Sequence, residues 1–250
     1  MNVIANLSVS LLIIALVTSC KKEVATDMIT PNTPVSAKVK TYTEDITTGG
    51  SQMVTTFRLD YDGNGRLVKL VSLSNTGDKF IYKYNTNSYS TDLYNSDELV
   101  MQQTSFIGSL MLIDSVVQYY NNEQALTEKY IYNADNKLIK LNQYDYKKAS
   151  GSSLYNYHNY SYDKNGNISR DADIFSVTTY DYYTDSKYEV VIGPAYSQKP
   201  NHLVKTTTYT IGGVSEIFNH FYTFDSNARL ITERITKLRS SDVLLKKYTY

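Results

Sequence analysis

The chain has 250 residues, of which 42% are hydrophobic, enough to build a sizeable core and to exclude disorder over most of its length. Its 25 Lys and Arg residues balance 25 Asp and Glu residues, so no net charge draws nucleic acid or an anionic membrane surface to it. Tyrosine is the outlying residue, with 25 copies beside no tryptophan and only 4 prolines. This composition is typical of β-strands and tight turns.

The first segment, residues 1–19, has no charged side chain and contains an apolar run from Leu11 to Val17. The run is far shorter than the roughly 20 residues that a membrane-spanning helix needs, so it predicts a cleavable export signal. With small residues before Cys20, the only cysteine, the segment resembles a bacterial lipoprotein signal, whose cysteine is lipidated and becomes the new N-terminus. An ordinary secretory signal with an unrelated cysteine is the alternative.

The lipoprotein resemblance implies that Cys20 carries acyl chains and that these chains hold the protein on a membrane. The residue directly after Cys20 is Lys21 and not an Asp, so the resemblance implies the outer membrane, with the domain facing the periplasm or the cell surface. Residues 20–36 include Pro31 and Pro34 without any apolar alternation, which predicts a flexible tether. Residues 37–250 are expected to form a single β-meander domain.

The rest of the chain alternates apolar and polar residues between clusters of Gly, Asn, Asp and Ser. Phe57, Leu59 and Tyr61 share one such face, and Phe218 to Phe224 follow the same period of two. The turn clusters predict an all-β fold, a long antiparallel up-and-down meander of roughly 14–16 strands rolled into an open or closed barrel-like sheet. Two interruptions are expected, a short helix begun by Ser96 and a long loop between Ile192 and His202.

A turn motif recurs in which an aliphatic residue follows an aromatic residue by six positions. Asp or Asn after the aromatic starts a turn by bonding its side chain to nearby backbone, and a later Gly or Asn tolerates positive φ. The aromatic and the aliphatic residue are expected to meet across the hairpin. The copies are Tyr61–Leu67, Tyr120–Leu126, Tyr132–Leu138, Tyr162–Ile168 and Phe224–Leu230.

The first copy, Tyr61-Asp-Gly-Asn-Gly-Arg-Leu67, resembles the YD repeats of Rhs-type and related cell-surface proteins. Together with the lipoprotein signal, it makes the chain similar to uncharacterised Gram-negative lipoproteins whose YD-like strands form one porin-like β-meander. The resemblance extends loosely over residues 50–250. It implies an architecture and an outer-membrane address, and it supplies no catalytic residue.

A search for catalytic or metal-binding patterns returns little. His158, His202 and His220 are scattered without metal-ligand spacing, and no hydrolase elbow, phosphate loop or dinucleotide fingerprint occurs. Asp60 to Gly65 opens like a calcium loop, but Val71 stands where the closing acid belongs, which favours a hairpin turn. We therefore expect no metal, no cofactor and no enzymatic activity.

The surplus of tyrosine points to a binding surface, because a tyrosine ring stacks on sugars and apolar groups while its hydroxyl forms hydrogen bonds. The alternative is that most of these rings form cross-strand pairs inside the sheet. The candidate contacts with a ligand are Tyr155, Tyr157, Tyr160, Tyr162, Tyr180, Tyr182 and Tyr183.

The leading hypothesis is a non-enzymatic, lipid-anchored scaffold of the cell envelope with a binding or structural role and a glycan or protein as ligand. A carrier of lipid or another apolar ligand in a β-groove is the main alternative. A glycoside-active enzyme is a more distant one, since carboxylate pairs such as Asp171 and Asp173, or Asp181 and Asp185, would have to meet across a cleft. A barrel embedded in the bilayer is disfavoured, because charged residues such as Lys246 recur on both faces.

Overall fold

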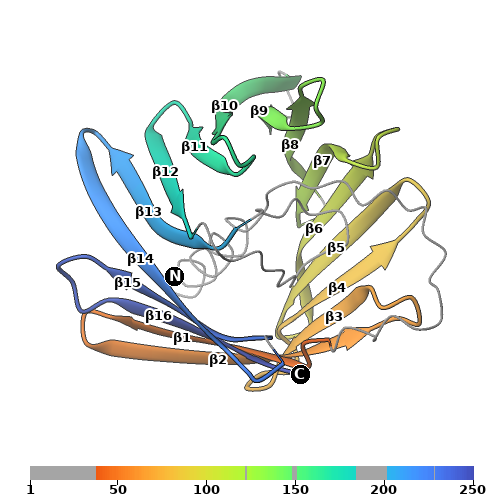
Figure 1. The fold of residues 1–250 in the computed structure, drawn as a ribbon. Coiled ribbons are helices and arrows are strands. Elements are labelled where there is room, and N and C mark those ends of the chain that lie inside the picture. Colours follow the sequence, from red (N-terminus) through yellow and green to blue (C-terminus); the bar gives the residue numbers. More distant parts are fainter. Residues whose placement is uncertain (1–37, 122, 148–150, 184–201, 228) are drawn as a thin grey trace.

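A computed structural model describes residues 38–121, 123–147, 151–183, 202–227 and 229–250. The 16 strands form one closed antiparallel barrel in which each strand pairs with its neighbours in sequence and β16 pairs with β1 (Figure 1). The strands are β1 Thr41–Thr48, β2 Ser51–Tyr61, β3 Leu67–Ser72, β4 Lys79–Tyr84, β5 Ser88–Asn95, β6 Glu98–Ile107, β7 Ile113–Tyr120, β8 Glu123–Tyr132, β9 Leu138–Lys147, β10 Gly151–Tyr162, β11 Ile168–Ala172, β12 Ser176–Tyr182, β13 Val204–Ile211, β14 Val214–Phe224, β15 Leu230–Lys237 and β16 Val243–Thr249.

This architecture confirms the all-β meander and its strand number, and it shows that the sheet closes. The short helix expected at Ser96 is wrong. Ser96 and Asp97 instead have positive φ angles of 50° and 67° and form the tight turn between β5 and β6. Asp tolerates this left-handed conformation, and two successive residues with positive φ match the right-handed twist of a hairpin.

Some sequence-based predictions lie outside the described residues. The export signal, Cys20, the tether and the loop with Pro194 and Pro200 belong to this group. Within the described ranges, no helix is long and apolar enough to cross a membrane.

The two faces of the barrel wall differ sharply in burial. Tyr42 pairs with Tyr248 and Glu44 pairs with Lys246, and these four side chains lie on one buried face, with Glu44 only 2% exposed. Lys247, which lies between Lys246 and Tyr248 in sequence, is exposed. Because a closed sheet crowds side chains on its concave side, the buried face is the inner face of the barrel.

The inner face is packed most tightly in one part of the wall, which we call the packed sector: β14–β16 and β1–β5. A cluster of buried side chains there consists mainly of leucine and tyrosine, and partly buried aromatic rings pack against it. The Tyr42 and Tyr248 rings stack with their centroids 5.4 Å apart. The buried members are Val39, Tyr42, Leu59, Leu67, Leu70, Tyr82, Leu230 and Tyr248.

Four of the five copies of the turn motif lie at the same end of the barrel, where each even-numbered strand leads into the next odd-numbered one. There the aromatic and the aliphatic residue pair across the hairpin as expected, for example Tyr61 with Leu67 and Tyr162 with Ile168. The copy at Tyr120 is an error, because Tyr120 pairs with Glu123 in a tight hairpin at the opposite end. Since this end also holds the start of β1 and the end of β16, we call it the terminal rim.

Each part of the motif has a defined structural role. An Asp62 carboxylate oxygen accepts hydrogen bonds from the backbone N–H groups of Asn64 and Arg66, and the other oxygen accepts one from Nε of Arg66. Gly65 has a φ of 75°, which glycine adopts without steric cost. The Arg66 guanidinium then lies 4.5 Å from the ring centroid of Tyr84 on β4. The turn is thus tied both to itself and to the next hairpin.

The tyrosines that end even-numbered strands form a second tie along the terminal rim. Each donates its hydroxyl to a backbone carbonyl at the start of the preceding odd-numbered strand, as Tyr162 does to Leu138 at 2.8 Å. Burial raises the pKa of Tyr61 to about 12, so its hydroxyl stays a donor. These hydrogen bonds around the terminal rim give part of the tyrosine surplus a structural role. The donors are Tyr61, Tyr84, Tyr132, Tyr162, Tyr182 and Tyr250.

Candidate functional site

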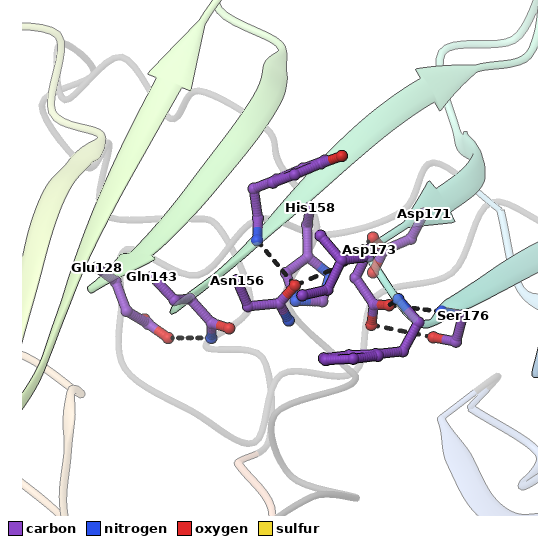
Figure 2. Close-up of polar contacts among 10 residues, drawn as sticks. Glu128, Gln143, Asn156, His158, Asp171, Asp173 and Ser176 are labelled. Carbon is purple, nitrogen blue, oxygen red and sulfur yellow. Dashed lines mark hydrogen bonds and ion pairs between the residues drawn. The ribbon is translucent and has the colours of Figure 1, made fainter. Parts of the chain in front are cut away.

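The inner face of β8–β12, which we call the part-exposed sector, is less filled than the packed sector. Most of its inward side chains keep part of their surface exposed, including many that are polar. Figure 2 shows a row of these side chains running from Glu128 on β8 to Asp171 on β11. We call the inward-facing set the inner polar patch: Glu128, Tyr130, Gln143, His158, Tyr160 and Asp171.

Glu128 is the first centre of the patch. Its Oε2 accepts a hydrogen bond from the Tyr130 hydroxyl at 2.9 Å, and its Oε1 accepts one from Nε2 of Gln143 at 2.9 Å. Burial and the nearby Glu128 carboxylate raise the pKa of Tyr130 well above its usual value, so the hydroxyl remains a donor. Strand register places these groups together, because Glu128 pairs with Gln143 across β8 and β9.

His158 and Asp171 form the second centre. The His158 Nδ1 lies 2.9 Å from Oδ1 of Asp171, and the side chains are 21% and 17% exposed. Burial by itself would lower the pKa of His158, but the Asp171 hydrogen bond and charge, with the charge of Asp173, raise it above the usual value. The imidazole also stacks on Tyr160, with ring centroids 6.2 Å apart. The patch therefore presents a polar edge beside a flat aromatic surface.

Two other residues drawn in Figure 2 support the backbone. The buried Asn156 accepts hydrogen bonds from the N–H groups of Tyr157 and Ile174, and so ties the bulge in β10 to the turn after β11. Asp173 accepts from the N–H of Ser176 at 2.6 Å and from its hydroxyl at 3.0 Å. Burial opposes this, yet these hydrogen bonds lower the pKa of Asp173, so the turn keeps its charged cap.

The structure divides the seven candidate tyrosines between the two faces. Tyr160 belongs to the inner polar patch, Tyr180 lies beside it on the inner face, and the hydroxyls of Tyr162 and Tyr182 are used in the terminal rim. The remaining three lie elsewhere. Tyr183 donates its hydroxyl to the His220 carbonyl, Tyr157 points outward with Lys140 against its ring, and Tyr155 is 59% exposed at the β10 bulge. They do not form one surface.

A second group of charged inner side chains belongs to the packed sector. Glu233 accepts from His220 Nδ1 at 3.0 Å and from Lys246 Nζ at 2.9 Å. Burial alone would raise the pKa of Glu233, but Lys246 and His220 lower it to about 2. Thr207 lies 3.0 Å from the other imidazole nitrogen of His220. His220 is therefore a buried histidine held by its neighbours, and the group is little exposed to a ligand.

The sequence did not single out Glu128 or Gln143. Both are polar residues at inward positions of strands that otherwise alternate apolar and polar residues, and that break in the pattern was the available signal.

The calcium-like loop is a hairpin, since both Asp62 oxygens accept hydrogen bonds from the turn. Among the residues that the structure describes, no cluster of three or more His, Cys, Asp or Glu is placed to hold a metal ion.

Two solved structures share this fold. A porin-like protein from Bacteroides vulgatus ATCC 8482 aligns with a TM-score of 0.61 at 12% identity, over 86% of this chain and 99% of that one. A porin-like protein from Bacteroides uniformis ATCC 8492 aligns at 0.60 and 12% identity, over 84% and 96%. At this identity the likeness shows the fold, a porin-like β-barrel. No protein-family model and no curated protein matches the chain.

Proposed function

We propose that the chain is a non-enzymatic β-barrel protein of the cell envelope, anchored by lipid at Cys20, whose inner polar patch binds a neutral glycan. One observation carries the binding role. In the part-exposed sector, carboxylate, amide and imidazole groups keep accessible surface beside stacked rings, whereas the packed sector is filled by a cluster of buried inward side chains. Sugar hydroxyls donate to carboxylates, and the apolar face of a sugar packs on aromatic rings.

The outer face near the β1–β16 closure supports a lipid anchor as the contact with the membrane. A barrel that spans a bilayer carries an outward apolar band about 25 Å tall. Here the outward positions of neighbouring strands near the β1–β16 closure are largely threonine or charged. They include Thr41, Thr43, Asp45, Thr56, Arg58, Asp60, Arg234, Lys247 and Thr249.

The same contacts favour binding over catalysis. A glycoside hydrolase needs one carboxyl group that can give up a proton and a second that acts as base or nucleophile. Glu128 already accepts from Tyr130 and Gln143, and Asp171 accepts from His158. These hydrogen bonds stabilise the ionised form of each carboxylate as a fixed acceptor.

The lipid-carrier alternative has less support. Inward apolar side chains of the packed sector contact one another and form a filled core. An apolar cargo would have to displace those contacts. Native mass spectrometry after mild extraction tests this point, and we expect the bare acylated chain; a stoichiometric co-purifying lipid beyond the anchor would favour the carrier.

The binding role is tested with the purified mature chain and a panel of neutral polysaccharides in isothermal titration. We expect one polysaccharide to bind, and Tyr160→Leu and Asp171→Asn to weaken its binding by about tenfold, since each removes one stacking or charged hydrogen-bonding contact. Tyr94→Leu is the control, because Tyr94 is an outward tyrosine of β5 that carries Lys79 against its ring and lies in neither patch.

Two results would count against this function. Equal losses with Tyr94→Leu and Tyr160→Leu would remove the inner face from the site, and release of reducing sugar by the natural chain would make it an enzyme. The anchor is tested separately: Cys20→Ser should move the protein from the membrane fraction to the soluble fraction, and unchanged fractionation would exclude a lipid anchor at this residue.

A further inference from the structure

The outer face of β8 and β9 holds a cavity that the inner polar patch does not use. It has a volume of about 200 Å³ and lies on the wall directly behind that patch. Register places the lining outward, since Thr127 pairs with Tyr144 and both alternate with the inward Glu128 and Gln143. Its lining residues are Gln124, Thr127, Lys129, Tyr144 and Tyr146.

The lining combines flat rings with polar groups held in place. Tyr144 and Tyr146 project from the same side of β9, roughly 6.8 Å apart along the strand. Gln124 donates from Nε2 to the Thr127 hydroxyl at 3.0 Å, which orients both side chains at the edge of the cavity. Tyr146 is 38% exposed, so its ring is available for stacking.

The charge around the cavity has a single sign. The Lys129 ammonium lies 5.8 Å from the Tyr144 ring centroid, and the Lys140 ammonium lies 5.2 Å from that of Tyr157 on β10. Glu128 and Asp145 point inward, and none of the outward residues in register here carries a carboxylate. These outward residues are Thr127, Lys129, Ile131, Lys140, Asn142, Tyr144, Tyr146, Tyr157 and Asn159. Cations placed over aromatic faces without a neighbouring acid are available to an anionic ligand.

Asn142 adds an independent observation. It pairs in register with Lys129 on one side and with Tyr157 on the other. Its Oδ1 is buried and has no hydrogen-bond partner among the residues that the structure describes. A buried acceptor without a donor costs about 1–3 kcal/mol, so stability alone does not account for asparagine here. Rotation of the amide toward the cavity would let a ligand hydroxyl supply the missing donor.

We propose that this outer tyrosine–lysine patch, formed by the cavity lining with Lys140, Asn142 and Tyr157, binds an acidic polysaccharide. Carboxylate or sulfate groups would meet the two lysines, sugar rings would stack on Tyr144 and Tyr146, and hydroxyls would reach Gln124, Thr127 and Asn142. A compact cavity with amide and hydroxyl groups suits a sugar unit. A phosphodiester strand is instead held mainly by a row of basic residues along its backbone, so a nucleic acid fits less well.

The test uses the purified mature chain with polygalacturonate and heparin as acidic probes, dextran as the neutral probe and single-stranded DNA as the competing polyanion. We expect the acidic polysaccharides to bind more tightly than dextran and DNA, and binding to weaken as salt rises. Lys129→Gln should lower affinity about tenfold, and Tyr144→Ala about three- to tenfold, with the thermal transition retained in Lys129→Gln. Asn142→Val should weaken binding without lowering that transition.

Lys247→Gln is the matched control, because Lys247 is an exposed outward lysine on β16, far around the wall. Asp171→Asn, which alters the inner polar patch, should leave acidic-polysaccharide binding unchanged, so the two sites can fail independently. The proposal is overturned if dextran or DNA binds as well as the acidic polysaccharides. It is also overturned if Lys247→Gln has the same effect as Lys129→Gln, or if none of the three patch variants weakens binding.

Discussion

The packed and part-exposed sectors are built from the same kind of strand and pair their inward charged groups, yet these pairs differ in how far they are exposed. In the packed sector, Glu233 and Lys246 are 13% and 8% exposed and bind each other directly. In the part-exposed sector, His158 and Asp171 keep 21% and 17% of their surface. A buried charge must be paired, whereas a part-exposed one is also hydrated. The first arrangement serves stability, and the second leaves part of each group accessible, as the proposed ligand site requires.

The largest expected effect comes from breaking the buried ion pair. Lys246→Met should lower the free energy of unfolding by about 3–5 kcal/mol, because it leaves the Glu233 charge buried without a lysine, beside His220 and the Tyr222 hydroxyl. Asp171→Asn, its counterpart in the part-exposed sector, should cost much less because water reaches His158. Urea unfolding followed by circular dichroism measures both. Equal losses of unfolding free energy in the two variants would show that the pairs in the two sectors contribute alike to stability.

Acid should act on the packed sector. Lys246 and His220 lower the pKa of Glu233 from 4.5 to about 2 against the effect of burial. A carboxyl whose folded pKa is depressed stabilises the fold above its unfolded pKa, and that contribution is lost as pH falls from about 4.5 to 2. The shift corresponds to about 3 kcal/mol. Glu233→Gln should flatten the stability profile in this window, and an unchanged acid limb would contradict the assignment.

The terminal rim should behave alike in both sectors. Tyr61→Phe and Tyr162→Phe each remove one hydroxyl bond to a backbone carbonyl, at 2.8 Å in both cases. Each should therefore lower the free energy of unfolding by about 0.5–1.5 kcal/mol. Tyr157→Phe on the outer face is the control and should have almost no effect. A loss confined to Tyr61→Phe would show that the rim ties only the packed sector.

The smallest effect is expected at His158, at the alkaline side. Burial opposes its protonation, but Asp171 and Asp173 raise the pKa of His158 above 6.5. A group whose folded pKa is raised stabilises the fold below its unfolded pKa, and the contribution disappears as pH rises through the folded value. NMR titration of the imidazole in the natural chain measures the pKa of His158. His158→Gln should remove the decline in stability, as measured by unfolding at pH 6 and pH 9. A His158 pKa below its ordinary value would contradict the contact with Asp171.

Local features were the most predictable from the sequence. The turn motif depends on contacts within about six residues, so Tyr61 and Leu67 were placed correctly opposite each other. The failures also have local causes. At Tyr120 the same spacing occurs in a chain segment where Asn121 takes a positive φ and closes a shorter hairpin. At Ser96 a capping pattern competed with a tight turn, and the pairing of β5 with β6 favoured the turn.

The candidate site was only partly predictable, because it depends on the register between neighbouring strands, which reaches beyond any single turn motif. His158 and Asp171 are 13 residues apart, and Gln143 and Glu128 are 15 apart. Alternation assigns Tyr160 and Tyr157 to opposite faces of β10, which already divides the tyrosine cluster. Burial on each face, however, follows from the curvature of the wall and the neighbouring strands.

By itself the sequence determined the strand period, the aromatic-flanked turns and the all-β class, since these follow from the conformational preferences of neighbouring residues. Closure was decided only by the tertiary structure, through pairs such as Thr41 with Thr249 at opposite ends of the described chain. Closure fixes which face is concave. It thereby decides which polar residues are buried as pairs, which remain part-exposed, and where the tyrosines and lysines gather on the outside.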